Sequence, residues 1–207
     1  LRVYYRTHPN VEPHAIPHPY LLYTYERNFE SRHWADHRRW VRVRTNSHGF
    51  RTHEFYPKLP GQYRILVMGD SFIYGRIADQ DATTPAVLEK LLKQRISGNI
   101  EVLSLGIPSY SGIRYAMLAR LYYDYIRPDL VIVALDQSDF NEDLRRLKDY
   151  QLDANGDPLV LKSEARLAES ERLCPLCGIP FRRDRGDGHA RFVARIGMAL
   201  EARRPFG

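Results

Sequence analysis

Three short polar segments each follow a run of apolar residues, and together they carry the side chains best suited to chemistry. They are Gly69–Ser71, Gly106–Ser109 and Asp136–Asp139. A serine just beyond a buried strand can attack a carbonyl carbon while N–H groups of the adjoining turns stabilise the developing oxyanion. The sequence therefore favours acyl chemistry with Ser71 as the nucleophile. A turn serine that only caps the next segment is the structural alternative.

An open parallel sheet would bring these segments to one edge. Ile65–Met68 and Leu130–Leu135 are continuous apolar runs, and Ile100–Leu105 is a shorter apolar segment, as in strands covered on both faces. Thr84–Pro85 predicts the start of a helix, and Ile113–Tyr125 has helical amphipathic spacing. Strands that alternate with helices predict a three-layer α/β/α fold with a parallel, flavodoxin-like sheet, whose ligands bind at the carboxyl ends of the strands.

The chain divides into three expected segments. Residues 1–63 form an irregular or short-stranded lead-in, residues 64–162 form the α/β core, and residues 163–207 are helical or irregular. Within the core, Asp153–Pro158 predicts a tight turn with Leu159–Leu161 as its return strand. Because no long apolar run follows the third strand, we expect the sheet to be incomplete at its C-terminal side.

The segment Arg64–Gly75 resembles the first sequence block of the SGNH/GDSL hydrolase family, in which a strand leads to Gly-Asp-Ser and a trailing glycine. Asn46–Arg51 is similar to the lead-in found before that strand in many bacterial members, and Val102–Ser111 resembles the second block. The resemblance covers residues 46–160. It implies an SGNH-like fold that acts on ester bonds as an esterase, a deacetylase or an O-acyltransferase, with Ser71 as the nucleophile and an ester or acylated carbohydrate as substrate.

The resemblance also implies an oxyanion hole formed by Ser71, Ser109 and Ser138. A glycine commonly holds the position of Ser109 in the family, and serine keeps the backbone N–H if it can adopt the required dihedral angles. The third block usually reads Gly-x-Asn-Asp, whereas Ser138 stands here in the place of the asparagine, and the loss of one oxyanion donor costs on the order of 10²–10³ in rate. Supporting roles are expected for Asp70, Gly106 and Asp139.

The family's last block, Asp-x-x-His, supplies the general base and the carboxylate that orients it. No Asp-x-x-His follows Asp139 in this chain. His189 is the nearest candidate, but Asp184 and Asp187 precede it at other spacings. We expect His189 to be a surface residue and the base to lie beyond Gly207 on a longer chain.

Two alternatives remain open. One is a catalytically impaired SGNH-like module that binds carbohydrate or a protein partner, in which Tyr74, Tyr110 and Tyr115 either stack on sugar rings or pack in the core. The other is a metal-dependent phosphotransfer or receiver-like domain that would use carboxylates at the strand ends. The first strand lacks an Asp-x-Asp pair and no lysine is suitably placed, so we expect neither a metal nor a cofactor. The carboxylates in question are Asp70, Asp136 and Asp139.

Composition narrows the classes of partner. The net charge is +6, and residues 1–63 hold ten Lys/Arg against five Asp/Glu, so the excess lies outside the expected core. We interpret the basic residues of Arg38–Arg44 as a solvated face and predict no nucleic-acid partner. Cys174 and Cys177 supply half of a zinc site at most. No run of eighteen apolar residues occurs, and the compartment stays open between an extracytoplasmic and a cytoplasmic location.

Overall fold

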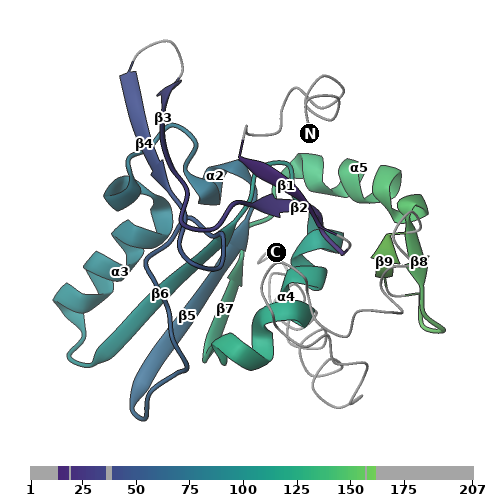
Figure 1. Ribbon diagram of the computed structural model, residues 1–207. Helices are drawn as coiled ribbons and strands as arrows, with labels where there is room; N and C mark the ends of the chain where they lie inside the picture. Colours follow the sequence, from purple (N-terminus) through teal and green to yellow (C-terminus); the bar gives the residue numbers. More distant parts are fainter. Residues whose placement is uncertain (1–13, 19, 36–38, 157, 162–207) are drawn as a thin grey trace, which may run out of the picture.

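The computed structural model describes residues 14–161 except 19, 36–38 and 157. At its centre is a parallel three-stranded sheet in the order β6-β5-β7. The central strand β5 (Gln62–Gly69) pairs with β6 (Asn99–Gly106) along its whole length and with β7 (Leu130–Val133) over four residues. All three strands point toward the same edge, which confirms the predicted parallel sheet (Figure 1).

Helices cover both faces of this sheet. The helix α3 (Thr84–Arg95) packs through Leu88 and Leu92 on the face that carries Ile65 and Val67. The helix α4 (Gly112–Ile126) packs on the opposite face, as Figure 1 shows. Successive residues of β5 point to opposite faces, so both faces of the strand are buried. The three-layer α/β/α prediction is therefore confirmed.

The lead-in contains two antiparallel hairpins, one of β1 (Ala15–His18) with β2 (Leu22–Tyr25) and one of β3 (Glu30–Ala35) with β4 (Arg39–Arg44). These short strands lie where the sequence predicted irregular or short-stranded structure. Their buried side chains join the core cluster between the sheet and α4. Those side chains are Ala15, Tyr23, Tyr25, Val41 and Val43.

After β7 the chain forms α5 (Gln137–Arg146) and then a hairpin of β8 (Tyr150–Leu152) with β9 (Pro158–Leu161). A turn in which Gly156 N–H donates to Asp153 O supports the predicted hairpin. The short helices α2 (Ser71–Tyr74), η1 (Gln80–Ala82) and η2 (Leu147–Asp149) complete the elements. The expected helices after residue 162, and with them Cys174, Cys177 and His189, lie outside the described residues.

One expectation needs correction. We predicted the third strand over Leu130–Leu135 and expected it to be covered like the first, but β7 ends at Val133 and its side chains Leu130 and Ile132 are 43 % and 37 % exposed. Among the described residues β7 pairs only with β5, so it is an edge strand. No helix in the described part of the chain is long and apolar enough to cross a membrane.

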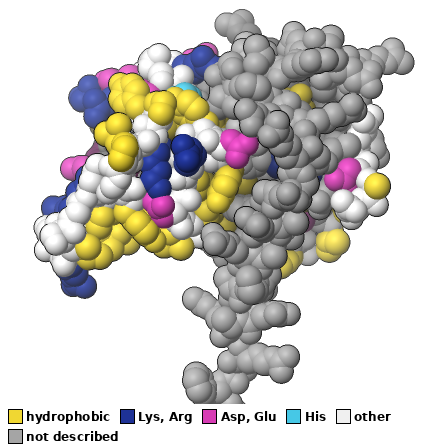
Figure 2. All heavy atoms as spheres, turned by 90° about the horizontal axis from the view of Figure 1, so that it is seen from below, with side chains coloured by type: hydrophobic (Ala, Val, Ile, Leu, Met, Phe, Trp, Pro, Cys, Tyr) yellow, Lys and Arg dark blue, Asp and Glu magenta, His cyan; other side chains and the backbone are white. Residues whose placement is uncertain are grey.

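The two ends of the sheet differ in character. Where the strands begin, Arg64 is buried and pairs with Glu101, and its backbone N–H donates to Asp129 at 2.7 Å. Lys58 also pairs with Asp129, so charged side chains fix this end. Seen from below, the described surface shows basic and acidic side chains next to one another among hydrophobic ones (Figure 2). Glycines and serines occupy the opposite, carboxyl end, where the candidate site lies.

Candidate active site

Ser71 is the first residue of α2, the single helical turn that follows β5. Asp70 caps this turn, because its carboxylate accepts the N–H of Phe72 at 2.9 Å. Gly75 ends the turn in the left-handed conformation, with φ 73°, and donates its N–H to Ser71 O at 3.0 Å. The predicted strand, turn and helix around the serine are thus present, and Ser71 is half-buried.

Two glycines let this turn rest on the sheet. A Cβ at Gly106 would lie 2.5 Å from Tyr74 N and 2.7 Å from the carbonyl carbon of Ile73, which are backbone atoms of α2. A Cβ at Gly69 would lie 2.4 Å from the Ile73 side chain. The end of β6 and the turn of Ser71 are therefore in direct contact, which brings the first and second polar segments together.

The lead-in residue Arg51 fastens the other end of α2. Its buried guanidinium donates to the carbonyl oxygens of Tyr74 at 3.1 Å, Gly75 at 2.6 Å and Ala78 at 2.6 Å. The same group lies 5.2 Å from the ring centroid of Tyr74. The sequence marked Arg51 only as part of a family-like motif, whereas the structure shows that it ties the lead-in to the loop after Ser71.

Ser109 adopts the left-handed conformation, with φ 59°, in the loop after β6. It is the third residue of the turn Ile107–Tyr110, in which Tyr110 N–H donates to Ile107 O at 3.2 Å. Serine therefore does adopt the conformation that glycine takes more readily. Among the described residues neither the Ser71 N–H nor the Ser109 N–H has a hydrogen-bond acceptor.

Ser138 lies on the first turn of α5, after β7. Its hydroxyl and its backbone N–H both donate to Asp136 Oδ1, at 2.7 Å and 2.8 Å. These two hydrogen bonds lower the pKa of Asp136. The hydroxyl proton of Ser138 is therefore committed to the N-cap of α5, and an oxyanion would compete with a carboxylate for it.

Asp139 is buried and closes the capping box of α5 by accepting the Asp136 N–H at 3.0 Å. Burial raises the pKa of Asp139, and the negative charges of Asp70 and Asp136 raise it further. The hydrogen bond from the Asp136 N–H acts in the opposite direction but does not outweigh them. Burial and the charges of Asp139 and Asp70 likewise raise the pKa of Tyr115, whose hydroxyl lies 3.4 Å from Asp139. Ala134 N–H donates to Met68 O at 2.9 Å, so the third polar segment begins beside the first and all three strand ends lie at one edge of the sheet.

The structure decides between the two roles considered for Tyr74, Tyr110 and Tyr115, which are stacking on a sugar and packing in the core. The hydroxyl of Tyr115 donates to Tyr110 O, and Tyr74, Tyr110 and Tyr115 are each no more than 2 % exposed. Buried rings cannot stack on a substrate, so these tyrosines pack in the core.

No described histidine side chain is hydrogen-bonded to Ser71. His14 lies 3.1 Å from the Tyr74 hydroxyl, and His18 accepts two N–H groups of its own turn. His48 stacks on Phe55, and His53 lies 3.3 Å from Glu101. With His189 outside the described residues, the general base is not assigned within the described part of the chain.

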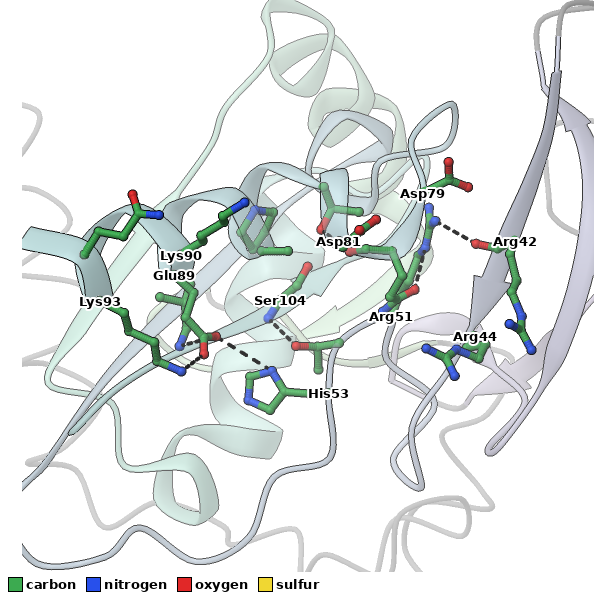
Figure 3. Close-up of a pocket in the computed structure, with 17 residues that line it drawn as sticks. Arg42, Arg44, Arg51, His53, Asp79, Asp81, Glu89, Lys90, Lys93 and Ser104 are labelled. Carbon is green, nitrogen blue, oxygen red and sulfur yellow. Dashed lines mark hydrogen bonds and ion pairs between the residues drawn. The ribbon is translucent and has the colours of Figure 1, made fainter.

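A cavity of about 870 Å³ lies elsewhere, between α3, β4 and the outer edge of β6 (Figure 3). Ser71 does not line it. Several of its charged side chains already have partners within the chain: Glu89 contacts Lys93 and lies 3.8 Å from His53, and Arg51 is held by carbonyl oxygens. We therefore assign no ligand to this cavity. No group of three or more metal-binding side chains lies among the described residues.

Comparisons with known proteins add little to this geometry. No family model and no curated protein matches the chain. Among the solved structures that resemble it is an esterase AlinE4 mutant, which is 19 % identical over 72 % of this chain and 100 % of that chain, with a TM-score of 0.35. At that score the likeness supports no conclusion about this chain.

Proposed function

We propose that this chain carries an SGNH/GDSL-type site that acts on ester bonds, as a hydrolase or an O-acyltransferase, with Ser71 as the nucleophile. The placement of Ser71 supports the proposal: it begins a single helical turn at the end of the central strand, and the other two strand ends converge on that turn. The sequence resemblance of Arg64–Gly75 to the family's first block points to the same residue.

In the proposed reaction the Ser71 oxygen forms a bond to the carbonyl carbon of the ester, and its proton passes to a general base. The negative charge that develops on the carbonyl oxygen is met by the N–H groups of Ser71 and Ser109, which have no other described acceptor. Ser138 would join them as a third donor on leaving Asp136. The alcohol departs with a proton, and water or an acceptor hydroxyl then attacks the acyl-serine and releases Ser71.

A second function has a specific observation in its favour. The Ser138 hydroxyl is held by Asp136, and no described histidine side chain reaches Ser71. Both features suit a catalytically impaired SGNH-like module that binds an acylated carbohydrate or a protein partner. The two functions differ in one measurable property, which is whether Ser71 is an activated nucleophile.

Covalent labelling with a fluorophosphonate, followed by intact mass, tests the proposal. We expect the wild-type protein, expressed at its full natural length, to gain one label, and Ser71→Ala in the same background to gain none. Ser97→Ala, which removes an exposed serine from the loop between α3 and β6, is the matched control and should be labelled like the wild type. Labelling that persists in Ser71→Ala would contradict the assignment of the nucleophile. A folded wild-type chain that takes no label would favour the binding module instead.

A further inference from the structure

The turn that presents Ser109 has a definite type. Pro108 fixes a negative φ at its second position, and Ser109 has φ 59° at its third, so Ile107–Tyr110 is a type II turn. The third position of such a turn normally holds glycine, because the Cβ of any other residue makes the left-handed conformation unfavourable. The commoner type I turn would accept proline and serine at these positions without that cost.

The turn type decides where the Ser109 N–H points. Types I and II differ mainly by rotation of the central peptide, here between Pro108 and Ser109, by about 150–170°. The Pro108 carbonyl and the Ser109 N–H lie on opposite sides of that planar peptide, so rotation reverses both. A contact that holds the Pro108 carbonyl therefore also holds the Ser109 N–H.

Such a contact comes from the N-terminal hairpin. The Tyr23 hydroxyl, on β2, donates to the Pro108 carbonyl oxygen. The Tyr110 hydroxyl donates in return to the Tyr23 carbonyl oxygen, and the two rings meet edge to face with centroids 5.5 Å apart. Tyr23 is 3 % exposed and Tyr110 is 1 % exposed, so neither hydroxyl is free to turn toward solvent.

Arg114 holds the next carbonyl. Its guanidinium, on α4, donates to Ser109 O at 2.5 Å. The same group lies 5.9 Å from the ring centroid of Tyr23 and 5.4 Å from that of Tyr110, and Arg114 is 1 % exposed. The carbonyls on both sides of Ser109 thus each accept a hydrogen bond from a buried side chain.

We propose that Tyr23 and Arg114 are positioning residues that keep the Ser109 N–H turned into the oxyanion hole. They supply by hydrogen bonding the conformation that a glycine would adopt without assistance. The role of the Ser109 N–H in an oxyanion hole rests on the proposed function. The effect of Tyr23 on the turn type does not, and it can be tested separately. Neither side chain needs to touch the substrate.

The experiment is a double-mutant cycle on the rate constant of fluorophosphonate labelling. Tyr23→Phe is measured in the wild-type background and in the Ser109→Gly background. Because one oxyanion donor is worth on the order of 10²–10³ in rate, we expect Tyr23→Phe to slow labelling about tenfold or more in the first background and less than about twofold in the second. Tyr63→Phe removes the hydroxyl of an exposed tyrosine at the start of β5, at the opposite end of the sheet from Ser109, and it should leave the rate unchanged. If Tyr23→Phe does not fold, Arg114→Met takes its place in the cycle.

Crystal structures of the wild type and Tyr23→Phe report on the turn independently of labelling. We expect a positive φ at Ser109 in the wild type and a negative φ in the variant. Equal slowing in both backgrounds, or a type II turn that survives in Tyr23→Phe, would overturn the inference while leaving Ser71 as the nucleophile. If the wild type is not labelled, the proposed function fails, and the role of Tyr23 in the turn is then decided by the crystal structures alone.

Discussion

The hydroxyl of Ser138 can donate one hydrogen bond, and Asp136 accepts it at 2.7 Å. An asparagine carboxamide at this position would carry two N–H hydrogens on a longer side chain. The Ser138 backbone N–H would still satisfy Asp136, at 2.8 Å, so the cap of α5 does not depend on the hydroxyl. The residue is therefore free to change without loss of the helix start.

We predict that Ser138→Asn speeds fluorophosphonate labelling of Ser71 by about tenfold, because it adds an oxyanion donor that serine supplies poorly. The measurement is the second-order rate constant of labelling, with Ser138→Ala as the matched variant. Since the hydroxyl must leave Asp136 before it can donate, Ser138→Ala should slow labelling by less than about tenfold. A loss of 10²-fold in Ser138→Ala would show that the hydroxyl does act as a full donor.

At this scale the sequence predicted the positions of the candidate residues better than their hydrogen bonds. Ser71 follows a strand and Ser109 lies in the next strand-end loop, both as expected from the apolar runs. The bond from Ser138 to Asp136 and the contacts of Arg114 depend on side-chain directions, which periodicity does not determine. The hydrogen bond from Tyr23 that fixes the turn of Ser109 was not predicted, because Tyr23 and Pro108 are 85 residues apart in sequence.

At the scale of the elements, the contact between α2 and the end of β6 determines where Ser71 lies. That contact exists because Gly106 has no side chain, and the obstacle to adding one is backbone rather than a flexible side chain. The N-terminus of α4 is fixed in a similar way, since Asp143 of α5 accepts the Ile113 N–H at 3.0 Å. The loops that carry Ser71, Ser109 and Ser138 are thus held by the elements next to them.

We predict that Gly106→Ala displaces α2, lowers the free energy of unfolding by about 1–3 kcal/mol and slows the labelling of Ser71. The comparison variant is Gly61→Ala, which adds a Cβ at a left-handed glycine, φ 73°, with no atom within 4 Å. Gly61→Ala should lose stability through backbone strain alone and keep the wild-type labelling rate. Denaturant unfolding and labelling, measured on both, separate displacement of α2 from general destabilisation. Equal labelling rates in the two variants would contradict the claim that the contact between α2 and Gly106 determines the position of Ser71.

The sequence predicted the elements of the sheet well and their surroundings less well. The runs that became β5 and β6 are apolar because both faces of each strand are covered. The predicted helix at Thr84 is covered only in part: Leu88 and Leu92 of α3 pack on the sheet, whereas Leu91 and the C-cap residue Ile96 are 45 % and 51 % exposed. Spacing alone could not show how much of the helix the sheet would cover.

On the scale of the whole molecule, the lead-in and the α/β core share one hydrophobic cluster. Tyr23, Tyr25 and Val43 of the hairpins belong to the same buried cluster as Leu66 of β5 and Met117 of α4. In β4 the buried Val41 and Val43 alternate with arginines, but the partner that these side chains cover is distant in sequence, so the shared cluster was not predicted. Part of the positive charge of the lead-in is used internally, since Arg39 pairs with Asp79 and Arg42 with Glu30.

Because the hairpin of β1 and β2 packs in this shared core, the buried His18 makes the free energy of unfolding depend on pH. His18 is 3 % exposed, and its Nδ1 accepts the N–H groups of Tyr20 and Leu21, each at 3.2 Å. Burial lowers its pKa from 6.5 to about 3, so the folded chain holds His18 neutral. A base with a depressed folded pKa contributes stability that is complete above its unfolded pKa and is lost as the pH falls toward the folded value. The window for His18 is therefore pH 6.5 down to about 3.

We predict that the wild type loses stability relative to His18→Asn across this window, by about 2 kcal/mol at pH 5, because the unfolded chain takes up the proton first. Asparagine keeps an acceptor for the two N–H groups and does not titrate. The measurement is the free energy of unfolding by denaturant for both chains from pH 8 to pH 4. Above pH 7.5 their difference should be constant, and it isolates the cost of the substitution itself. If the two curves run parallel down to pH 4, the hairpin opens before His18 is protonated, or the ring is exposed in solution, and the packing of the lead-in on the core would need revision.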